Sequence, residues 1–368
     1  MTTTAAEPSP LLKEIFNRER LQHFADELCG IEPGFDPQRF IALASRDLEN
    51  LSIMQRLRQV AETFHHTLPG DYRHKLSVLR ELAPRINHGF ASIALPEYVA
   101  LYGRTDRQVS LQALHFFTRF GSSEFAIRPF LQDDLEATLE VMQDWAVDEN
   151  DHVRRLASEG CRPRLPWSFQ LKQLIVNPDP VWPILDRLRS DPSLYVRKSV
   201  ANHLNDITKD HPDWVLEKVG AWPADNTHTK WIIRQALRTL VKKGHPSALA
   251  QLGATQAAKV EIETFAVTPA AVLLGQTVEL QAVIRSTSAT DQTLVVDYAI
   301  HYVKKSGESS AKVFKWKEVV LAPNHALSLS IRRPIRNFTT RVHYPGTHRV
   351  DLLVNGSAVA STQFELTV

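Results

Sequence analysis

The chain contains 368 residues, of which 43% are hydrophobic and 23% are charged, and its formal net charge is +2. This composition is close to the globular average, and the length predicts two domains rather than one core. No apolar run approaches the ~20 residues that a membrane-spanning helix needs. Because the total charge is nearly neutral, any surface for an anionic partner must be a local basic patch.

The N-terminal segment, residues 1–10, is expected to be a short disordered tail. It has neither the basic start nor the apolar stretch of a secretory signal. The chain has only two cysteines, Cys29 and Cys161, which lie far apart and belong to no Cys-x-x-Cys pair. This spacing indicates neither a disulfide framework nor a zinc site, and it fits a reducing compartment. We therefore expect a cytoplasmic protein.

Residues 11–254 are predicted to form one helix after another. Apolar residues recur there at helical spacing, for example at Leu111, Leu114 and Phe117. Proline and glycine separate the segments, and no long strand-like alternation occurs.

A short internal repeat recurs within this helical region. Residues 153–157 (VRRLA) recur at 196–201 (VRKSVA) and more weakly at 233–237 (IRQAL). The copies are roughly 37–43 residues apart, the period of HEAT-type helix pairs. An acidic turn precedes the copies, so we expect an Asp or Ser cap at the start of each second helix and arginine on the concave side. The repeat predicts an all-α HEAT-like superhelix, or α-solenoid, over residues 11–254.

Residues 260–368 show a different pattern, with apolar and polar residues in alternation. Turn signals separate about seven short strands, which is typical of a β-sandwich. Asn355-Gly356 between two apolar stretches predicts a tight hairpin. Since no Cys–Trp–Cys frame is present, the expected fold is an all-β immunoglobulin-like sandwich, with a fibronectin-like sandwich equally open.

Three stretches of the helical region are dense in polar and aromatic residues. They are residues 120–130 (FGSSEFAIRPF), 152–167 (HVRRLASEGCRPRLPW) and 195–206 (YVRKSVANHLND). These stretches closely resemble the signature segments of the AlkC family of alkylpurine DNA glycosylases, in the HEAT-like AlkC/AlkD superfamily. The resemblance extends over about residues 10–250, and the sandwich is similar to the Ig-like domain that some bacterial family members carry.

The resemblance implies a monofunctional DNA glycosylase of base excision repair. Its expected substrates are cationic bases in double-stranded DNA, such as 3-methyladenine, 3-methylcytosine and 1-methyladenine, removed without base flipping. No metal or organic cofactor is expected. The protein is expected to be a monomer that associates with the nucleoid. The chemistry agrees, because a cationic base is a good leaving group and leaves an oxocarbenium-like sugar. Carboxylates, a tryptophan and a positioned water are what such a site needs.

Four residues are candidates for catalysis: Glu124, Glu159, Trp167 and Asp206. Glu124 follows Gly-Ser-Ser, which suits a helix N-terminus, so it is also a plausible capping residue. Glu159 lies one turn after Arg155 and could form a simple surface ion pair. Trp167 follows two prolines, so it is not expected in the middle of a helix, although it could cover a core. Asp206 could equally belong to a helix C-cap.

Basic residues at corresponding places in the repeats are candidates for phosphate binding. Further candidates lie near turns of the sandwich, which the resemblance implies helps to hold DNA. For each of them a solvated surface position is the alternative. The DNA-binding candidates are Arg155, Arg162, Arg164, Arg197, Lys198, Arg234, Arg238, Lys304, Arg332 and Arg333.

Two other functions fit a helical array joined to a sandwich. One is a non-catalytic protein that recognises alkylated DNA, and the other is a HEAT-repeat scaffold that binds proteins. The clustering of polar residues in three short stretches argues against the scaffold. The presence of both glutamates and the tryptophan argues against a catalytically inactive relative.

Overall fold

The computed structural model describes residues 11–223, 225–254, 257–338 and 341–367. The expected tail, residues 1–10, lies outside the described residues. The chain divides into two compact units, one formed by Met1–Asp210 and Pro223–Ile232 and the other by His211–Trp222 and Ile233–Val368. No helix in the described part of the chain is long and apolar enough to cross a membrane.

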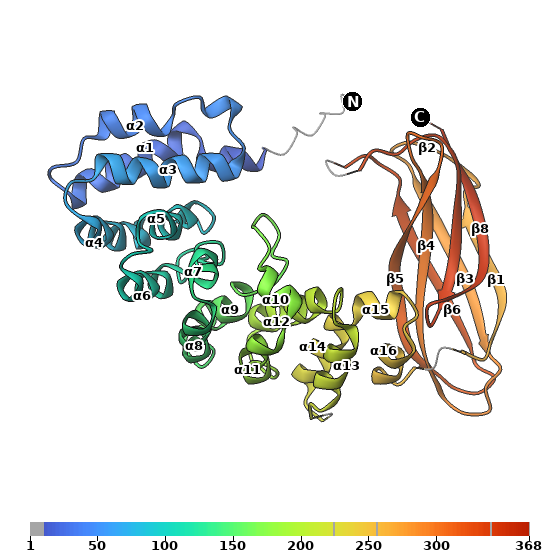
Figure 1. The fold of residues 1–368 in the computed structure, drawn as a ribbon. Helices are drawn as coiled ribbons and strands as arrows, with labels where there is room; N and C mark the ends of the chain where they lie inside the picture. Colours follow the sequence, from blue (N-terminus) through green and yellow to red (C-terminus); the bar gives the residue numbers. More distant parts are fainter. Residues whose placement is uncertain (1–10, 224, 255–256, 339–340, 368) are drawn as a thin grey trace. The chain divides into compact units, whose positions relative to one another are not determined.

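The first unit is a succession of short helices that stack in chain order (Figure 1). Helices close in sequence pack together, and α9 also packs against α12. Phe24, Phe40 and Phe64 are fully buried and form part of the core near the N-terminus. The helices are α1 (Arg18–Ile31), α2 (Pro37–Ala44), α3 (Ile53–Thr67), α4 (Tyr72–Leu82), α5 (Ala94–Tyr102), α6 (Arg107–Phe117), α7 (Arg128–Asp133), α8 (Leu135–Trp145), α9 (Asp151–Glu159), α10 (Lys172–Val176), α11 (Trp182–Arg187) and α12 (Leu194–Ile207).

The two strong copies of the internal repeat form α9 and α12, as a helical repeat requires. The N-cap of α9 is Asn150 instead of the expected Asp or Ser, whereas the N-cap of α12 is the expected serine, Ser193. Asn150 caps α9 by accepting from the backbone N–H of His152. Ser193 precedes α12 but makes no side-chain cap bond. Its hydroxyl donates instead to Asp151 at 2.7 Å, so this serine links the two repeats.

The arginines of the repeat also have equivalent contacts. Nη1 of Arg154 donates to the carbonyls of Asp148 and Glu149, both at 2.9 Å. Nη1 of Arg197 donates to the carbonyls of Asp191 and Pro192, both at 2.8 Å. Each guanidinium therefore fixes the turn that precedes its own helix.

The second unit combines short helices with a β-sandwich. Its three-stranded sheet has the order β1-β3-β6, and its five-stranded sheet has the order β2-β8-β7-β4-β5. The helices of this unit are α13 (Pro212–Gly220), α15 (Arg238–Lys242) and α16 (Pro246–Gln251). The last four residues of α14 (Thr227–Ala236) also belong to it. The strands are β1 (Val260–Thr268), β2 (Ala271–Leu273), β3 (Thr277–Ser286), β4 (Gln292–Val303), β5 (Ser309–Leu321), β6 (Ala326–Pro334), β7 (Gly346–Val354) and β8 (Ser357–Thr367).

The sandwich confirms the all-β expectation. Alternate residues of β3 are buried between the sheets, whereas β4 and β7 contain runs of consecutive buried residues. Tyr298, Ile300 and Val350 belong to one of its core clusters. The predicted hairpin at Asn355-Gly356 is also confirmed, because it joins β7 to β8 and both residues have positive φ, 47° and 78°. Positive φ at both central residues is what this tight turn requires.

The position of the domain boundary stays a prediction. The last helix ends at Gln251 and the first strand begins at Val260, on either side of the expected division. The contacts nevertheless group α15 and α16 with the sandwich rather than with the repeats.

Candidate active site

The first carboxylate of the candidate site, Glu124, lies in a turn before α7. Its Oε2 accepts a hydrogen bond from the Ser122 hydroxyl at 2.9 Å. The α-helix begins at Arg128, four residues later than the sequence pattern suggested. Pro129 explains the late start, because proline lacks an N–H and is favoured in the first turn of a helix. Glu124 is therefore not a residue of a helical first turn.

Three carboxylates and two arginines from separate segments form one charge cluster: Glu124, Arg155, Glu159, Arg162 and Asp206. Nη1 of Arg155 lies 2.6 Å from Oε2 of Glu124, and Nη2 lies 3.5 Å from Oε1 of Glu159. Nη1 of Arg162 donates to the same Glu159 oxygen at 2.6 Å. Nε and Nη2 of Arg162 lie 2.9 and 2.8 Å from Oδ2 of Asp206. The turn before α7, α9, its following loop and α12 thus meet at this cluster.

The charge cluster is largely removed from water. Its side chains are 7–15% exposed. Burial by itself lowers the pKa of Arg155, but Glu124 and Glu159 outweigh it, so the pKa lies above its usual value. The same balance, with Glu159 and Asp206, raises the pKa of Arg162. Both arginines therefore stay protonated, and with Lys209, whose Nζ lies 3.0 Å from Oδ1 of Asp206, three cationic groups contact the three carboxylates.

The three carboxylates differ in how fully they are hydrogen-bonded. Oε1 of Glu159 is shared by the two arginines, and Oε2 accepts from the Ser199 hydroxyl at 2.6 Å. Oδ1 of Asp206 lies 3.0 Å from Nζ of Lys209, and Oδ2 is held by Arg162. Oε1 of Glu124 has no hydrogen-bond partner among the described residues. Glu124 is thus the carboxylate with an oxygen available for a water or a substrate.

Two residues of α12 that the sequence analysis did not select belong to this site. The Tyr195 ring lies under the Arg155 guanidinium, with 4.7 Å between the ring centre and Cζ. Burial raises the pKa of the Tyr195 hydroxyl. Ser199 holds Glu159. Since Tyr195, Ser199 and Asp206 follow one another at i, i+4 and i+11, helical spacing places them on one face and could have identified them.

A buried arginine holds the loop that follows α9. The Arg128 side chain is inaccessible to solvent. Its Nη1 donates to the carbonyls of Gly160 and Arg162 at 3.0 and 2.8 Å, and its Nη2 donates to the Phe169 carbonyl at 2.5 Å. Burial lowers the pKa of Arg128 to about 10. The backbone of Arg162, which carries one of the two cluster arginines, is thereby fixed.

Trp167 lies in this loop, away from any helix, as the two prolines predicted. Its side chain is 60% exposed, and its φ is +64°, a left-handed conformation that bulky residues rarely adopt. Among the described residues, its only aromatic contact is an edge-to-face contact with Phe90, with 6.2 Å between the ring centroids. The structure thus presents an indole to solvent, and it gives no contact between this indole and the charge cluster.

A neutral histidine lies behind the cluster. Nδ1 of His203 is 2.9 Å from the carbonyl of Ser158, to which it donates. Burial, followed by the charge of Arg162, lowers the pKa of His203 to about 3. His203 therefore stays uncharged at neutral pH and adds no positive charge to the site.

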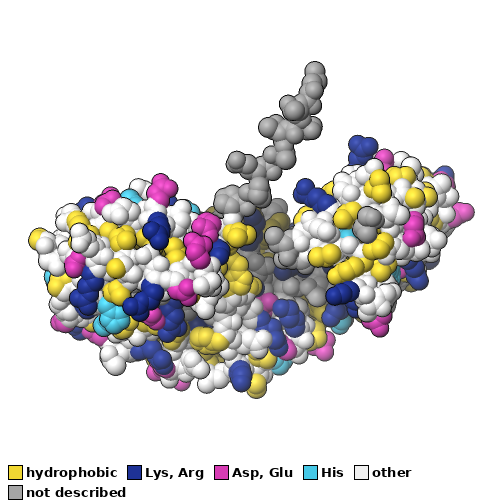
Figure 2. All heavy atoms as spheres, turned by 90° about the horizontal axis from the view of Figure 1, so that it is seen from above, with side chains coloured by type: hydrophobic (Ala, Val, Ile, Leu, Met, Phe, Trp, Pro, Cys, Tyr) yellow, Lys and Arg dark blue, Asp and Glu magenta, His cyan; other side chains and the backbone are white. Residues whose placement is uncertain are grey.

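The predicted phosphate ligands of the helical unit fall into three groups. Arg155 and Arg162 hold carboxylates within the charge cluster, and Arg164 makes two hydrogen bonds to Asp210, at 2.9 and 3.0 Å. Arg197 is bound to backbone carbonyls. Lys198 is exposed, and its side chain forms no hydrogen bond or ion pair with the described residues. Basic and acidic side chains are interspersed on the face of the helical part that Figure 2 shows.

The predicted ligands of the second unit are also spread over several elements. Arg234 lies 2.7 Å from Glu318, and Nη1 of Arg238 donates to the Gln235 carbonyl at 2.5 Å. Arg333 lies over the ring of Phe314, 4.5 Å from its centre. The remaining two, Lys304 and Arg332, are exposed. The structure does not gather these residues into one cluster.

The described residues contain no group of three or more His, Cys, Asp and Glu side chains that could hold a metal ion. The candidate site is therefore defined by its carboxylates, its arginines and the exposed indole nearby in the chain.

Comparisons with known proteins match both parts of the chain. A family described as "DNA alkylation repair enzyme" matches residues 54–240, and one described as "Uncharacterised protein YhaZ, C-terminal Ig-like domain" matches residues 261–368. YhaZ of Bacillus subtilis is 39% identical over 356 residues, which cover 96% of this chain and 99% of YhaZ.

A solved structure resembles the whole chain. Pseudomonas fluorescens alkylpurine DNA glycosylase AlkC, bound to DNA containing an abasic site analog, is 52% identical to it, with a TM-score of 0.94. The match covers 98% of this chain and 100% of that one. The chain therefore belongs to the AlkC-type branch of the DNA alkylation repair enzyme family and carries that branch's C-terminal Ig-like domain.

Proposed function

We propose that this protein is a monofunctional DNA glycosylase that hydrolyses the N-glycosidic bond of cationic alkylated bases in duplex DNA. The bases are 3-methyladenine and, in addition, 3-methylcytosine and 1-methyladenine. The observation that carries the proposal is the charge cluster, which gathers three largely buried carboxylates and leaves Oε1 of Glu124 without a hydrogen-bond partner among the described residues. The similarity to a DNA-bound alkylpurine DNA glycosylase supports it.

The charge cluster suits a reaction in which positive charge moves from the base to the sugar. The bond between C1′ and the base nitrogen breaks, its electron pair leaves with the base, and the cationic base becomes neutral. The sugar becomes oxocarbenium-like, and fixed negative charge in a poorly hydrated site stabilises it. Removing a single such electrostatic contact typically costs ~3–4 kcal/mol of transition-state stabilisation.

Water completes the reaction, and Glu124 is its proposed base. The water oxygen bonds to C1′ while one of its protons passes to Oε1 of Glu124, giving the free base and an abasic site. Since Ser122 and Arg155 both hold Oε2, the carboxylate is oriented with Oε1 outward. The oxygens of Glu159 and Asp206 are already bonded, so neither carboxylate is proposed as the base. Both are proposed to keep the two arginines in place and to supply negative charge.

Trp167 is proposed to contact the sugar or the lesion. Its exposed indole offers π-electron density to a cationic base, worth ~0.5–2 kcal/mol. Catalysis directed at the sugar does not need a pocket that encloses the base, which agrees with the proposed absence of base flipping. No step requires a metal ion or an organic cofactor.

For DNA binding, the contacts favour some predicted ligands over others. Lys198 is exposed and available for a phosphate, as is Arg332 on the sandwich. Lys304 is also exposed, but its Nζ lies 4.0 Å from Oε2 of Glu308. Arg197 already donates to two carbonyls, so it is expected to stabilise the repeat. We propose that a monomer binds duplex DNA through the helical region and the sandwich.

The deciding experiment measures release of free methylated bases from duplex DNA treated with a methylating agent, resolved by chromatography. Wild-type protein should release 3-methyladenine, and Glu124→Gln should release it at least tenfold more slowly with little change in DNA affinity. Glu140→Gln is the matched control, because Glu140 is an exposed residue of α8 outside the charge cluster.

Other outcomes would change the assignment. Binding of methylated DNA without any base release would replace the glycosylase by a damage-recognition protein. No preference for DNA at all would favour the protein-binding scaffold.

A further inference from the structure

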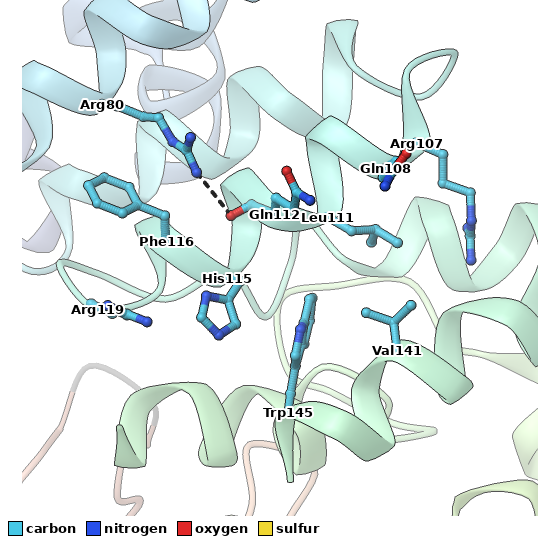
Figure 3. Close-up of a pocket in the computed structure, with 10 residues that line it drawn as sticks. All are labelled: Arg80, Arg107, Gln108, Leu111, Gln112, His115, Phe116, Arg119, Val141 and Trp145. Carbon is cyan, nitrogen blue, oxygen red and sulfur yellow. Dashed lines mark hydrogen bonds between the residues drawn. The ribbon is translucent and has the colours of Figure 1, made fainter. Parts of the chain in front are cut away.

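One concave feature of the first unit shares no residue with the charge cluster. A groove of about 750 Å³ follows α6 and is bordered by α4 and α8 (Figure 3). This volume is in the range of pockets that hold a small ligand, ~300–1,000 Å³. The lining residues are Arg80, Arg107, Gln108, Leu111, Gln112, His115, Phe116, Arg119, Val141 and Trp145.

The floor of the groove is apolar. Leu111 and Phe116 come from α6, and Val141 and Trp145 come from α8 (Figure 3). Leu111 and Trp145 are 5% and 7% exposed, whereas Val141 and Phe116 are half-buried. An occupant that places aliphatic side chains on this floor gains about 25 cal/mol for each Å² of apolar surface removed from water.

The aromatic rings of the floor are already covered by neighbouring side chains. The Arg80 guanidinium lies over the Phe116 ring at 5.0 Å, and His115 packs beside Trp145 with 5.9 Å between ring centroids. Proteins that bind single-stranded nucleic acids without sequence preference stack the bases on exposed aromatic faces. These two rings offer no such platform, which argues against a nucleic acid as the occupant.

The groove is lined by guanidinium groups without carboxylate partners. Among the described residues, Arg80, Arg107 and Arg119 make no salt bridge within 4.0 Å. Nη2 of Arg80 donates to the carbonyl of Gln112 at 3.3 Å, and Nη2 of Arg107 donates to the Thr138 hydroxyl at 3.0 Å. Both acceptors are neutral.

Other arginines of the same helical region, in contrast, are paired with carboxylates. Arg73 forms an ion pair with Asp106 at 2.6 Å, and Arg104 forms one with Asp133. Asp148, the carboxylate that His115 binds, is occupied by that contact at 2.8 Å. Asp148 also interacts electrostatically with Arg119. Among the described residues, none of the three guanidiniums of the groove forms an ion pair within 4.0 Å, and each could bind a carboxylate in a bidentate way.

We propose that this groove is the docking site of a partner protein that inserts a short acidic segment with aliphatic side chains. Its carboxylates pair with Arg80, Arg107 and Arg119, and its aliphatic side chains cover the floor. Charge complementarity selects acidic over basic segments, since like charges in contact would be repelled. Because the groove and the charge cluster have no residue in common, docking does not require the active site to change.

The proposal is tested by selecting a random 12-residue phage-displayed peptide library on the full-length protein. Peptides rich in Asp or Glu with Leu, Ile or Val should be enriched, and a selected peptide carrying a dye should bind in fluorescence polarisation. Arg80→Glu combined with Arg119→Glu should weaken that binding at least tenfold. Arg119→Glu alone, at an exposed position, gives a smaller loss in the same direction if the double variant does not fold.

Matched measurements decide among the alternatives. Arg39→Glu combined with Arg46→Glu changes the total charge equally at two exposed positions of the α2 region and should leave peptide binding unchanged. Base release from methylated DNA by the groove variants should equal that of wild type. Enrichment of peptides without acidic residues, equal loss of binding in both double variants, or displacement of the peptide by a dye-free oligothymidylate would overturn the proposal, the last in favour of a nucleic-acid groove.

Discussion

Replacing Arg128 by methionine tests how far the loop after α9 depends on one buried side chain. The substitution keeps most of the volume and removes every donor, so the carbonyls of Gly160, Arg162 and Phe169 lose their hydrogen bonds to the guanidinium. A buried acceptor left without a donor costs ~1–3 kcal/mol. Removal of a buried charge offsets part of that cost, so we expect a net loss of about 3 kcal/mol.

Such a loss is measurable by calorimetry of the full chain. At ~2–4 °C for each kcal/mol, the Tm of the helical unit should fall by roughly 6–12 °C. Arg128→Lys retains the charge but cannot reach three carbonyls at once, so its Tm should lie between those of wild type and the methionine variant. Arg46→Met, at an exposed position, should leave the Tm unchanged and serves as the control.

The same substitution should slow base release where the variant is still folded. Misplacement of a catalytic group by about 1 Å costs up to ~100-fold in rate, so we expect a decrease of about tenfold or more in kcat with nearly unchanged DNA affinity. A methionine variant with wild-type Tm and wild-type kcat would refute the argument that Arg128 positions this loop.

Four further predictions follow from single side chains. The pKa of His203 is about 3 in the folded protein and ~6.5 in the unfolded chain, so the unfolded chain binds the proton more readily. The contribution of His203 to the free energy of unfolding is therefore fully present above pH 6.5, and it is lost as the pH falls toward 3. Urea titrations across this range should show a weaker pH dependence for His203→Asn; an unchanged slope would contradict this. Ser199→Ala removes a donor to Glu159 and should lower kcat about tenfold while anisotropy reports wild-type DNA affinity; a loss of affinity alone would argue otherwise. Trp167→Ala should leave the Tm within ~1 °C, because the indole is exposed, but should slow base release; an undiminished rate would remove Trp167 from the site. Lys198→Ala should reduce the slope of log K against log salt by about 0.9 if Lys198 binds one phosphate, and an identical slope would exclude that contact.

Local sequence patterns predicted those features that depend on neighbours along the chain. The change from helical to alternating periodicity separated the two fold types, and Asn355-Gly356 located a hairpin because its backbone conformation is encoded in two residues. The pairing of Arg155 with Glu159 followed from their i, i+4 spacing. These predictions needed no information about packing.

Features that depend on tertiary packing were not accessible in this way. The contact between Glu124 and Arg155 joins a turn to a helix 31 residues later, and no local pattern determines that distance. The contacts of the repeated arginine, Arg154 in α9 and Arg197 in α12, also depend on tertiary packing. Its position in the repeat was recognised, but whether its guanidinium faces solvent or the carbonyls of the preceding turn depends on the path of that turn.

The sharing of guanidiniums within the charge cluster has a consequence for mutational work. Arg155 serves both Glu124 and Glu159, and Arg162 serves both Glu159 and Asp206. Energetic losses from residues in one network do not add, and double-mutant cycles measure the coupling. Pairs of substitutions within the cluster should therefore cost less than the sum of the single ones. Glu159, which touches both arginines, should show the largest coupling, so its role cannot be assigned from its own substitution alone.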